Sequence, residues 1–131
     1  ADLPQTICAV FQEARLIEEM TAVENVRLVA GALAEDDVRA ALEELLPGEA
    51  LDVAVSNLSG GQRRRVEIVR ALMCPGSAVL MDEPFSSLDE QTHRNAAAFV
   101  LGRLDGRTLL VASHNPGDDD LLDACGMQLF D

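Results

Sequence analysis

Apolar residues along the chain follow two alternating patterns, which predict strands and helices in turn. Short apolar runs bounded by turn residues are typical of buried strands, and apolar residues three and four apart are typical of helices. The runs predict strands over 6–11, 78–83, 108–113 and 127–130. The helical spacing predicts helices over 21–31, 35–46, 63–73, 89–104 and 118–124. Residues 51–57 show neither pattern and are expected to form a connector.

Capping residues mark two of these helix starts. Thr21 with Glu24, and Ser59 with Gln62, have the spacing of a reciprocal capping box. A helical stretch therefore lies inside an alternation of strands and helices. That order predicts an α/β protein with a mostly parallel sheet and a helical insert.

Composition and charge limit the class of protein. With 131 residues, 48% of them hydrophobic, the chain suits one domain with a substantial core. Its net charge of −13 disfavours nucleic acid as a main partner and direct attachment to anionic lipid. No apolar run has the length of a membrane span. The basic run Arg63–Arg65 is expected to form a solvated or interface face of its helix.

The three cysteines are Cys8, Cys74 and Cys125. They are odd in number, widely spaced and set among apolar residues. This pattern predicts reduced core thiols of a cytosolic protein, not disulfides or metal ligands.

The segment Ser59–Gln62 is a candidate phosphate site. Gly60 and Gly61 lack side chains that would block the backbone, and a helix start presents free N–H groups and the positive end of its dipole. The segment therefore suits an anion such as a γ-phosphate. In isolation, the same four residues favour a plain helix start, and only the flanking motifs reverse that preference.

The adjacent carboxylates Asp82 and Glu83 follow a buried strand. Ligands of α/β sheets bind at the carboxyl ends of strands. Asp82 is expected to hold Mg²⁺, and Glu83 to polarise an attacking water as general base. The alternative for this pair is capping of the following helix.

Taken in order, these motifs resemble those of an ABC transporter ATP-binding subunit, the nucleotide-binding domain of an ABC-type ATPase. Leu58–Gln62 matches the signature motif, Ala78–Glu83 resembles Walker B, and Ser86–Asp89 resembles the D-loop. Further segments of the chain resemble the Q-loop, the family's "L-T-V-x-E-N-V" and its switch histidine: Val10–Glu13, Met20–Val26 and Ser113–His114.

The resemblance implies a P-loop NTPase-like fold with a helical subdomain insert. Residues 1–12 and 74–131 would form part of the core sheet, and 13–73 the helical subdomain with the signature helix. The chain contains no G-x-x-x-x-G-K-[ST] loop. The N-terminal Walker A part is therefore expected to be missing, and the chain, which starts at Ala1, to be an inactive fragment. The family's phosphate-loop strand would lie between strands 108–113 and 127–130, so both would lack a neighbour.

The resemblance also implies roles for individual residues, with ATP and Mg²⁺ as cofactors. Glu83, His114 and Gln12 would be catalytic, and Asp82 and Gln12 would bind the metal. Another group would bind the ATP held by the opposite subunit or act across the interface: Ser59, Gly60, Gly61, Gln62 and Asp89. His93 matches no motif and receives no role.

The implied function is that of an ATP-binding and ATP-hydrolysing transporter subunit, which energises transport by nucleotide-driven head-to-tail dimerisation. Its partners would be a second ATP-binding subunit and a transmembrane permease subunit, through which it lies at the cytoplasmic face of the membrane. The alternative is a soluble ABC-type ATPase acting on nucleic acid or ribosomes. The short interval between Gln12 and Leu58, poor in basic segments, disfavours that alternative. A degenerate binding module is a third possibility, disfavoured by Glu83 and His114.

Overall fold

The chain folds around a parallel sheet whose strands follow one another in sequence order. The computed structural model describes residues 7–10, 15–113 and 128–130. Four strands in the order β1-β2-β3-β4 make up the sheet, and all three pairings are parallel. They are β1 (Ile7–Val10), β2 (Ala78–Asp82), β3 (Thr108–Ala112) and β4 (Gln128–Phe130). The predicted α/β class is confirmed.

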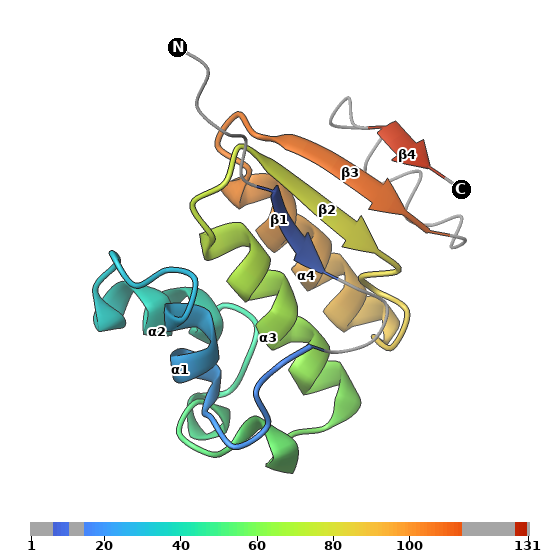
Figure 1. Ribbon diagram of the computed structural model, residues 1–131. Helices are drawn as coiled ribbons and strands as arrows, with labels where there is room; N and C mark the ends of the chain where they lie inside the picture. Colours follow the sequence, from blue (N-terminus) through green and yellow to red (C-terminus); the bar gives the residue numbers. More distant parts are fainter. Residues whose placement is uncertain (1–6, 11–14, 114–127, 131) are drawn as a thin grey trace.

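The helices form two layers beside the sheet (Figure 1). They are α1 (Ala22–Arg27), α2 (Glu35–Glu43), α3 (Gly60–Met73) and α4 (Glu90–Arg103), with short 3₁₀ helices η1 (Gly48–Ala50) and η2 (Val55–Asn57). Helix α3 contacts β1 and α4, whereas α1 and α2 pack against α3 and against each other. Helix α3 therefore lies between the sheet and the two smaller helices.

Both predicted capping boxes are present. Thr21 Oγ1 accepts the Glu24 N–H at 3.1 Å, and Glu24 Oε1 accepts the Thr21 N–H at 2.9 Å. Ser59 and Gln62 make the same reciprocal pair, each at 3.1 Å. The first two helices end earlier than predicted, at Arg27 and Glu43, and continue as turns. The helix expected over 118–124 lies outside the described residues.

The hydrophobic core lies on one face of the sheet. Val79 and Met81 of β2 are fully buried there, next to inward-facing residues of β1 and β3. Leu80 and Leu110 alternate with them and are 38% and 37% exposed on the opposite face. Because side chains alternate along a strand, α3 and α4 bury only one face of the sheet. In the described part of the chain, no helix covers the other face.

Strand β4 pairs directly with β3, which corrects the expectation that both would lack a neighbour. Leu110 lies opposite Gln128, and Ala112 lies opposite Phe130. The edge of β3 presents N–H and C=O groups that require partners, and a parallel strand supplies them. The chain closes this edge with its own terminal strand.

A disulfide joins Cys8 and Cys74, so the expectation of reduced thiols was wrong for this pair. Cys8 lies on β1, and Cys74 is the C-cap residue of α3, which packs beside that strand. Their Cα atoms are 6.0 Å apart, within the usual range for a disulfide. The two cysteines are 66 residues apart in sequence, so the sequence alone did not indicate that they are close. The packing of α3 on β1 brings them together.

Candidate functional site

The two candidate carboxylates lie at the carboxyl end of β2. Asp82 is the last residue of the strand, and Glu83 follows with a φ of 48°. The Glu83 N–H donates to the Ala112 carbonyl, at the end of β3, over 2.7 Å. A positive φ is unfavourable for a residue with a side chain and persists where surrounding contacts hold it. The turn therefore fixes Glu83 against the end of the neighbouring strand.

The N-terminal end of α3 is open on one side and packed on the other. A Cβ added at Gly60 would meet no atom within 4 Å. At Gly61, an added Cβ would lie 3.5 Å from the Ser87 carbonyl oxygen and 3.7 Å from Leu88 Cδ2. The second glycine thus packs on the segment that precedes α4, whereas Gly60 faces open space. This arrangement leaves the start of α3 accessible to a ligand.

Asp89 caps α4. Its Oδ1 accepts the Thr92 N–H at 2.8 Å, and this hydrogen bond lowers the pKa of the Asp89 carboxyl, with a smaller contribution from Arg65. Arg65 in turn donates to the carbonyls of Gly61 and Leu45, at 3.2 and 2.7 Å. The predicted D-loop aspartate therefore has a structural role that the motif does not show. The sequence signal for this capping role was an Asp directly before a predicted helix.

All described candidate residues lie at one end of the molecule. In Figure 1, the arrowheads of β1, β2 and β3 and the N-terminal ends of α3 and α4 point to the same side. Ligands bind at this end in α/β sheets. Gln12 and His114 lie outside the described residues.

The carboxylates at the end of β2 are oxygen donors of the kind that Mg²⁺ prefers. Mg²⁺ is typically bound by one or two carboxylates together with water and phosphate oxygens. Asp82, the expected metal ligand, and Glu83, the expected general base, are both half-buried. Within residues 7–10, 15–113 and 128–130, no group of three or more His, Cys, Asp or Glu could hold a metal ion. The described residues therefore form no closed metal cage of their own.

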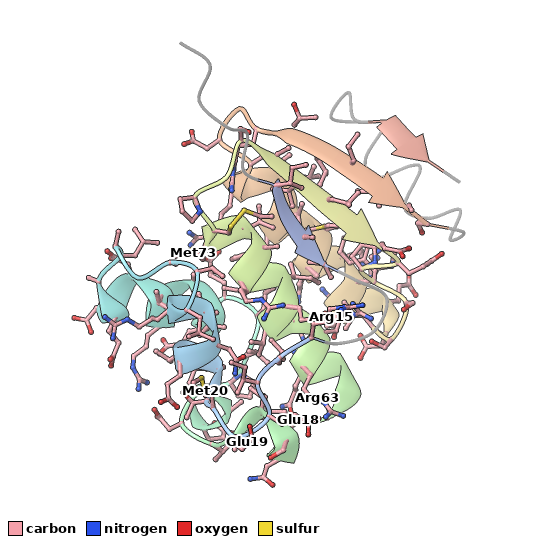
Figure 2. All side chains as sticks on the ribbon, in the orientation of Figure 1. Arg15, Glu18, Glu19, Met20, Arg63 and Met73 are labelled. Carbon is pink, nitrogen blue, oxygen red and sulfur yellow. A yellow bond between two sulfur atoms is a disulfide. The ribbon has the colours of Figure 1, made fainter. Side chains whose placement is uncertain are left out.

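The basic run on α3 differs from its expected arrangement. Arg63 is partly exposed, and its Nη1 lies 3.7 Å from Glu18 Oε1. Figure 2 shows the two residues close together. Arg64, in contrast, is only 6% exposed and pairs with the fully buried Glu67 at 3.1 Å. The expectation of a solvated or interface face was therefore wrong for Arg64. The helical period turns this residue toward the interior.

Asn25 is a second buried polar residue whose role sequence reasoning missed. Its side chain binds both the N–H and the carbonyl of Ile17, at 2.8 and 3.1 Å, and also donates to the carbonyls of Met20 and Thr21. A fully buried amide with its hydrogen bonds satisfied holds the neighbouring backbone in one conformation. In the sequence, only the motif match at residues 20–26 pointed to a role for Asn25.

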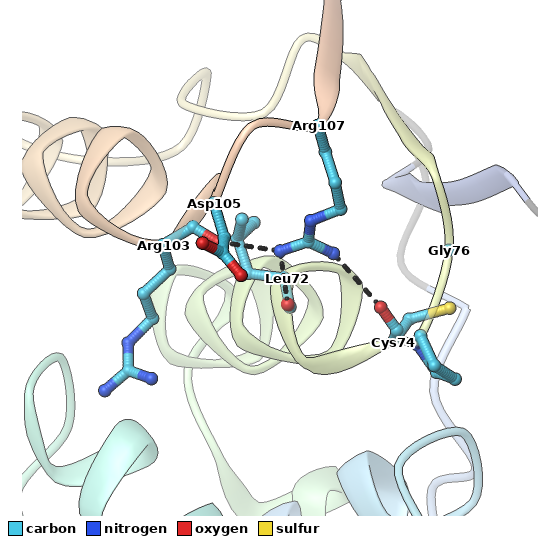
Figure 3. Close-up of a pocket in the computed structure, with 7 residues that line it drawn as sticks. Leu72, Cys74, Gly76, Arg103, Asp105 and Arg107 are labelled. Atoms are coloured by element: carbon cyan, nitrogen blue, oxygen red, sulfur yellow. Dashed lines mark hydrogen bonds between the residues drawn. The ribbon is translucent and has the colours of Figure 1, made fainter.

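A hollow of about 520 Å³ at the other end of the molecule serves a structural purpose (Figure 3). The Arg107 guanidinium in it donates to the carbonyls of Leu72, Cys74, Arg103 and Leu104, at 2.7–3.1 Å. The last carbonyls of a helix have no partner within it. Arg107 therefore caps the C-terminal ends of α3 and α4 and is not available to a ligand.

The parallel sheet, its helices and the residues at the strand ends define an α/β protein of the P-loop NTPase-like class. A family model described as "ABC transporter" matches residues 1–86. The chain belongs to the ABC transporter family. In the described chain, no helix is long and apolar enough to cross a membrane.

The chain is similar to ATP-binding proteins of both importers and exporters. The macrolide export ATP-binding/permease protein MacB 1 of Aeromonas hydrophila subsp. hydrophila is 40% identical over 114 residues, which cover 81% of this chain and 17% of the relative. The glucose import ATP-binding protein GlcV of Saccharolobus solfataricus is 41% identical over 120 residues, covering 83% of this chain and 33% of the relative. The chain thus spans a third or less of the length of these relatives.

Solved structures of a bacterial ABC transporter cassette share the fold. The dimeric structure of the cassette MJ0796 superposes with a TM-score of 0.78 at 29% identity, covering 89% of this chain and 56% of that one. Its post-hydrolysis state bound to ADP and Pi gives a TM-score of 0.75 at 30% identity, with the same coverage.

The capping role of Asp89 predicts a pH dependence of stability. The pKa of its carboxyl is lower in the folded chain, so its contribution to stability is complete above the unfolded pKa and is lost as pH falls through the folded pKa. Asp89→Asn keeps a capping oxygen but has no proton to bind. Urea unfolding should show a wild-type advantage over Asp89→Asn at about pH 7 that shrinks below about pH 4. A difference that stays constant down to about pH 2.5 would contradict this assignment.

Proposed function

We propose that this chain is part of the ATP-hydrolysing subunit of an ABC transporter and drives transport through ATP-dependent head-to-tail dimerisation. The open N-terminal end of α3 is the observation that carries the proposal. Gly60 faces open space there, beside a capped helix start that presents main-chain N–H groups. Such an end suits a phosphate held by a second copy. Membership of the ABC transporter family supports the same assignment.

Roles follow from the ends of the strands and helices. When bound, MgATP supplies the phosphoryl group for transfer and a cation that neutralises its charge. Asp82 holds the cation, and Glu83 accepts the proton of the attacking water. Ser59, Gly60, Gly61 and Gln62 at the start of α3 contact the partner's ATP, and Asp89 acts across the interface. Gln12 and His114 complete the proposed set.

We assign the chain to two parts of one ATPase domain. Residues 1–12 and 74–131 belong to the core sheet, and residues 13–73 form the helical subdomain. In support of this division, α1 and α2 pack against α3 and each other. Helix α3 is the part of this subdomain that packs against β1 and α4. A shift of the helical subdomain would therefore carry the signature motif with it.

The helical subdomain also carries a surface suited to a protein partner. Leu28, Val29 and Leu33 are 55%, 38% and 37% exposed, and they lie together in sequence just after α1. Clustered exposed apolar residues often mark protein contacts. We assign this surface to a transmembrane permease subunit, which would hold the ATPase at the cytoplasmic face of the membrane without direct lipid contact.

The chain by itself is expected to bind ATP weakly or not at all and to lack ATPase activity. Its 131 residues contain no glycine-rich loop with the lysine that provides phosphate affinity in this family. Calorimetric titration of the purified chain with MgATP tests this expectation. Micromolar affinity would contradict it and would require a phosphate site other than the one proposed.

Activity is measured on a complete cassette. We use this name for a protein in which these residues are joined to the family's phosphate-binding half, for example by fusion to that half of a relative. The proposal expects MgATP hydrolysis by the complete cassette. A folded complete cassette that binds ATP without hydrolysing it would point to a binding module instead.

A further inference from the structure

The Cys8–Cys74 disulfide closes the stretch of chain that contains the helical subdomain (Figure 2). Cys8 lies on β1, the strand that precedes this subdomain, and Cys74 is the C-cap residue of α3, its last helix. A disulfide restricts the segment between its two cysteines. The bond therefore joins the beginning and the end of the proposed helical subdomain, residues 13–73, at one point beside the sheet.

The disulfide can be reached from the surface. Both cysteines line a hollow of about 320 Å³ beside β1 and the end of α3. Cys8 is only 3% exposed, whereas Cys74 is half-buried. Cys74 also lines the larger hollow at the C-terminal ends of α3 and α4 (Figure 3). A small thiol that enters either hollow would therefore meet Cys74 more readily than Cys8.

Non-covalent contacts hold both cysteines in place without the disulfide. Cys8 lies opposite Val79 in the parallel pairing of β1 with β2. The Cys74 N–H donates to the Arg70 carbonyl at 3.0 Å, and the Cys74 carbonyl accepts from Arg107 Nη1 at 3.1 Å. None of these contacts involves sulfur. Reduction should therefore leave the fold intact, with the two residues still close enough for the bond to form again.

The location of the chain bears on the role of this bond. The proposed function places the chain at the cytoplasmic face of a membrane. Thiols are kept reduced in the cytosol, and disulfides that form there are mostly transient, with a catalytic or redox-sensing role. Exposed disulfides are also reduced more easily than enclosed ones. A bond that can be reached by a thiol, in a fold that does not depend on it, is suited to such a role.

We propose that Cys8 and Cys74 form a reversible redox site for a dithiol reductant. The inference rests on the proposed function. One thiolate of the reductant attacks Cys74 Sγ, the disulfide breaks, and Cys8 leaves as a thiolate that takes up a proton. The second thiolate of the reductant then attacks the mixed disulfide and releases Cys74, which takes up the second proton. Two electrons and two protons pass to the cysteine pair, and the dithiol becomes a disulfide.

The two redox forms differ in how the end of α3 is attached to the sheet. In the oxidised form, a covalent bond ties this end to β1. In the reduced form, packing and the Arg107 hydrogen bonds alone hold it. The oxidised form thus restrains a shift of the helical subdomain against the sheet. We expect the complete cassette to hydrolyse ATP more slowly when oxidised than when reduced.

The redox site is tested by counting thiols in the folded 131-residue chain, with Cys125→Ser as background so that only Cys8 and Cys74 are counted. The chain is treated with oxidised glutathione or with dithiothreitol, quenched in acid, denatured and labelled with a maleimide. Oxidised glutathione should leave no thiol and dithiothreitol two, with unchanged circular dichroism. In the control Cys74→Ser, one thiol should remain after dithiothreitol. Peptide mass spectrometry of the labelled wild-type chain identifies the same cysteines without the background substitution.

Two results would overturn the redox site. If dithiothreitol reduced the bond only in urea, the disulfide would be a structural one that no reductant reaches in the folded chain. If two thiols remained after oxidised glutathione, the bond would not form in the folded chain.

Control of the subdomain is tested by steady-state hydrolysis of MgATP by the complete cassette. Wild type should be several-fold faster after dithiothreitol than after oxidised glutathione. Cys74→Ser should hydrolyse ATP at the reduced rate under both conditions, which also controls for cysteines of the joined half. Equal wild-type rates in the two redox forms would overturn this control. A cassette inactive in both forms would instead refute the proposed function, while thiol counting would still decide the redox site.

Discussion

Glu83→Gln in the complete cassette should reduce ATP turnover by about 10²–10⁴-fold, the usual loss when a general base is removed. Gln has the shape of Glu and accommodates the same turn, in which the Glu83 N–H donates to the Ala112 carbonyl. The change therefore removes the base without a rearrangement of the strand end. Nucleotide binding should survive, because Asp82 and the helix start remain intact.

The control for this variant is Glu90→Gln. Glu90 lies in the first turn of α4 with its side chain 85% exposed, and its partner is Arg94 on the same helix. The chemical change is the same, but it lies on the helix surface, where an ion pair contributes little. Steady-state hydrolysis should be unchanged in Glu90→Gln. Wild-type turnover in Glu83→Gln would show that another group is the base.

Gly60→Ala should reduce hydrolysis by about 10²–10³-fold, comparable to the loss of one hydrogen-bond donor to a developing oxyanion. The methyl group would occupy the open space in front of the helix start, where the partner's phosphate is proposed to bind. The fold has room for it, because no atom lies within 4 Å of the added Cβ. Replacing Gly by Ala at a compatible backbone position typically stabilises a protein by about 0.4–1 kcal/mol, because it restricts the unfolded chain. Activity and stability should therefore change in opposite directions.

Gly102→Ala provides the matched control. Gly102 lies in α4, is exposed, and likewise has no atom within 4 Å of an added Cβ. The same methyl group is added there, away from the proposed phosphate site. Chemical denaturation should show both variants to be at least as stable as wild type, while only Gly60→Ala loses activity. Equal activity of the two variants would remove Gly60 from the site.

Local patterns in the sequence were enough to predict several helix starts and strands. The Thr21–Glu24 and Ser59–Gln62 boxes depend on residues three apart, and both formed as predicted. The strand that ends at Asp82 is an uninterrupted apolar run, which needs no distant partner to be recognised. Caps and periodicity are properties of a few neighbouring residues, so they are visible before any tertiary structure is known.

Features that depend on contacts distant in sequence were not predictable in the same way. The Cys8–Cys74 disulfide requires α3 to end beside β1, and the pairing of β4 with β3 depends on which strands compete for one edge. Glu67 lies in a polar stretch of the signature helix, where its burial follows only from the packing of α3 on its neighbours. The positive φ of Glu83 likewise comes from the contact with Ala112.

The head-to-tail ATP site is tested most directly by the mass of the complete cassette in solution. Multi-angle light scattering of Glu83→Gln should show a monomer without nucleotide and a dimer with MgATP, since ATP that is not hydrolysed continues to bridge the two copies. Addition of Gly60→Ala to the same cassette should return it to a monomer at the same ATP concentration. An ATP-dependent dimer of equal strength with and without Gly60→Ala would contradict the assignment of the α3 helix start to the partner's phosphate.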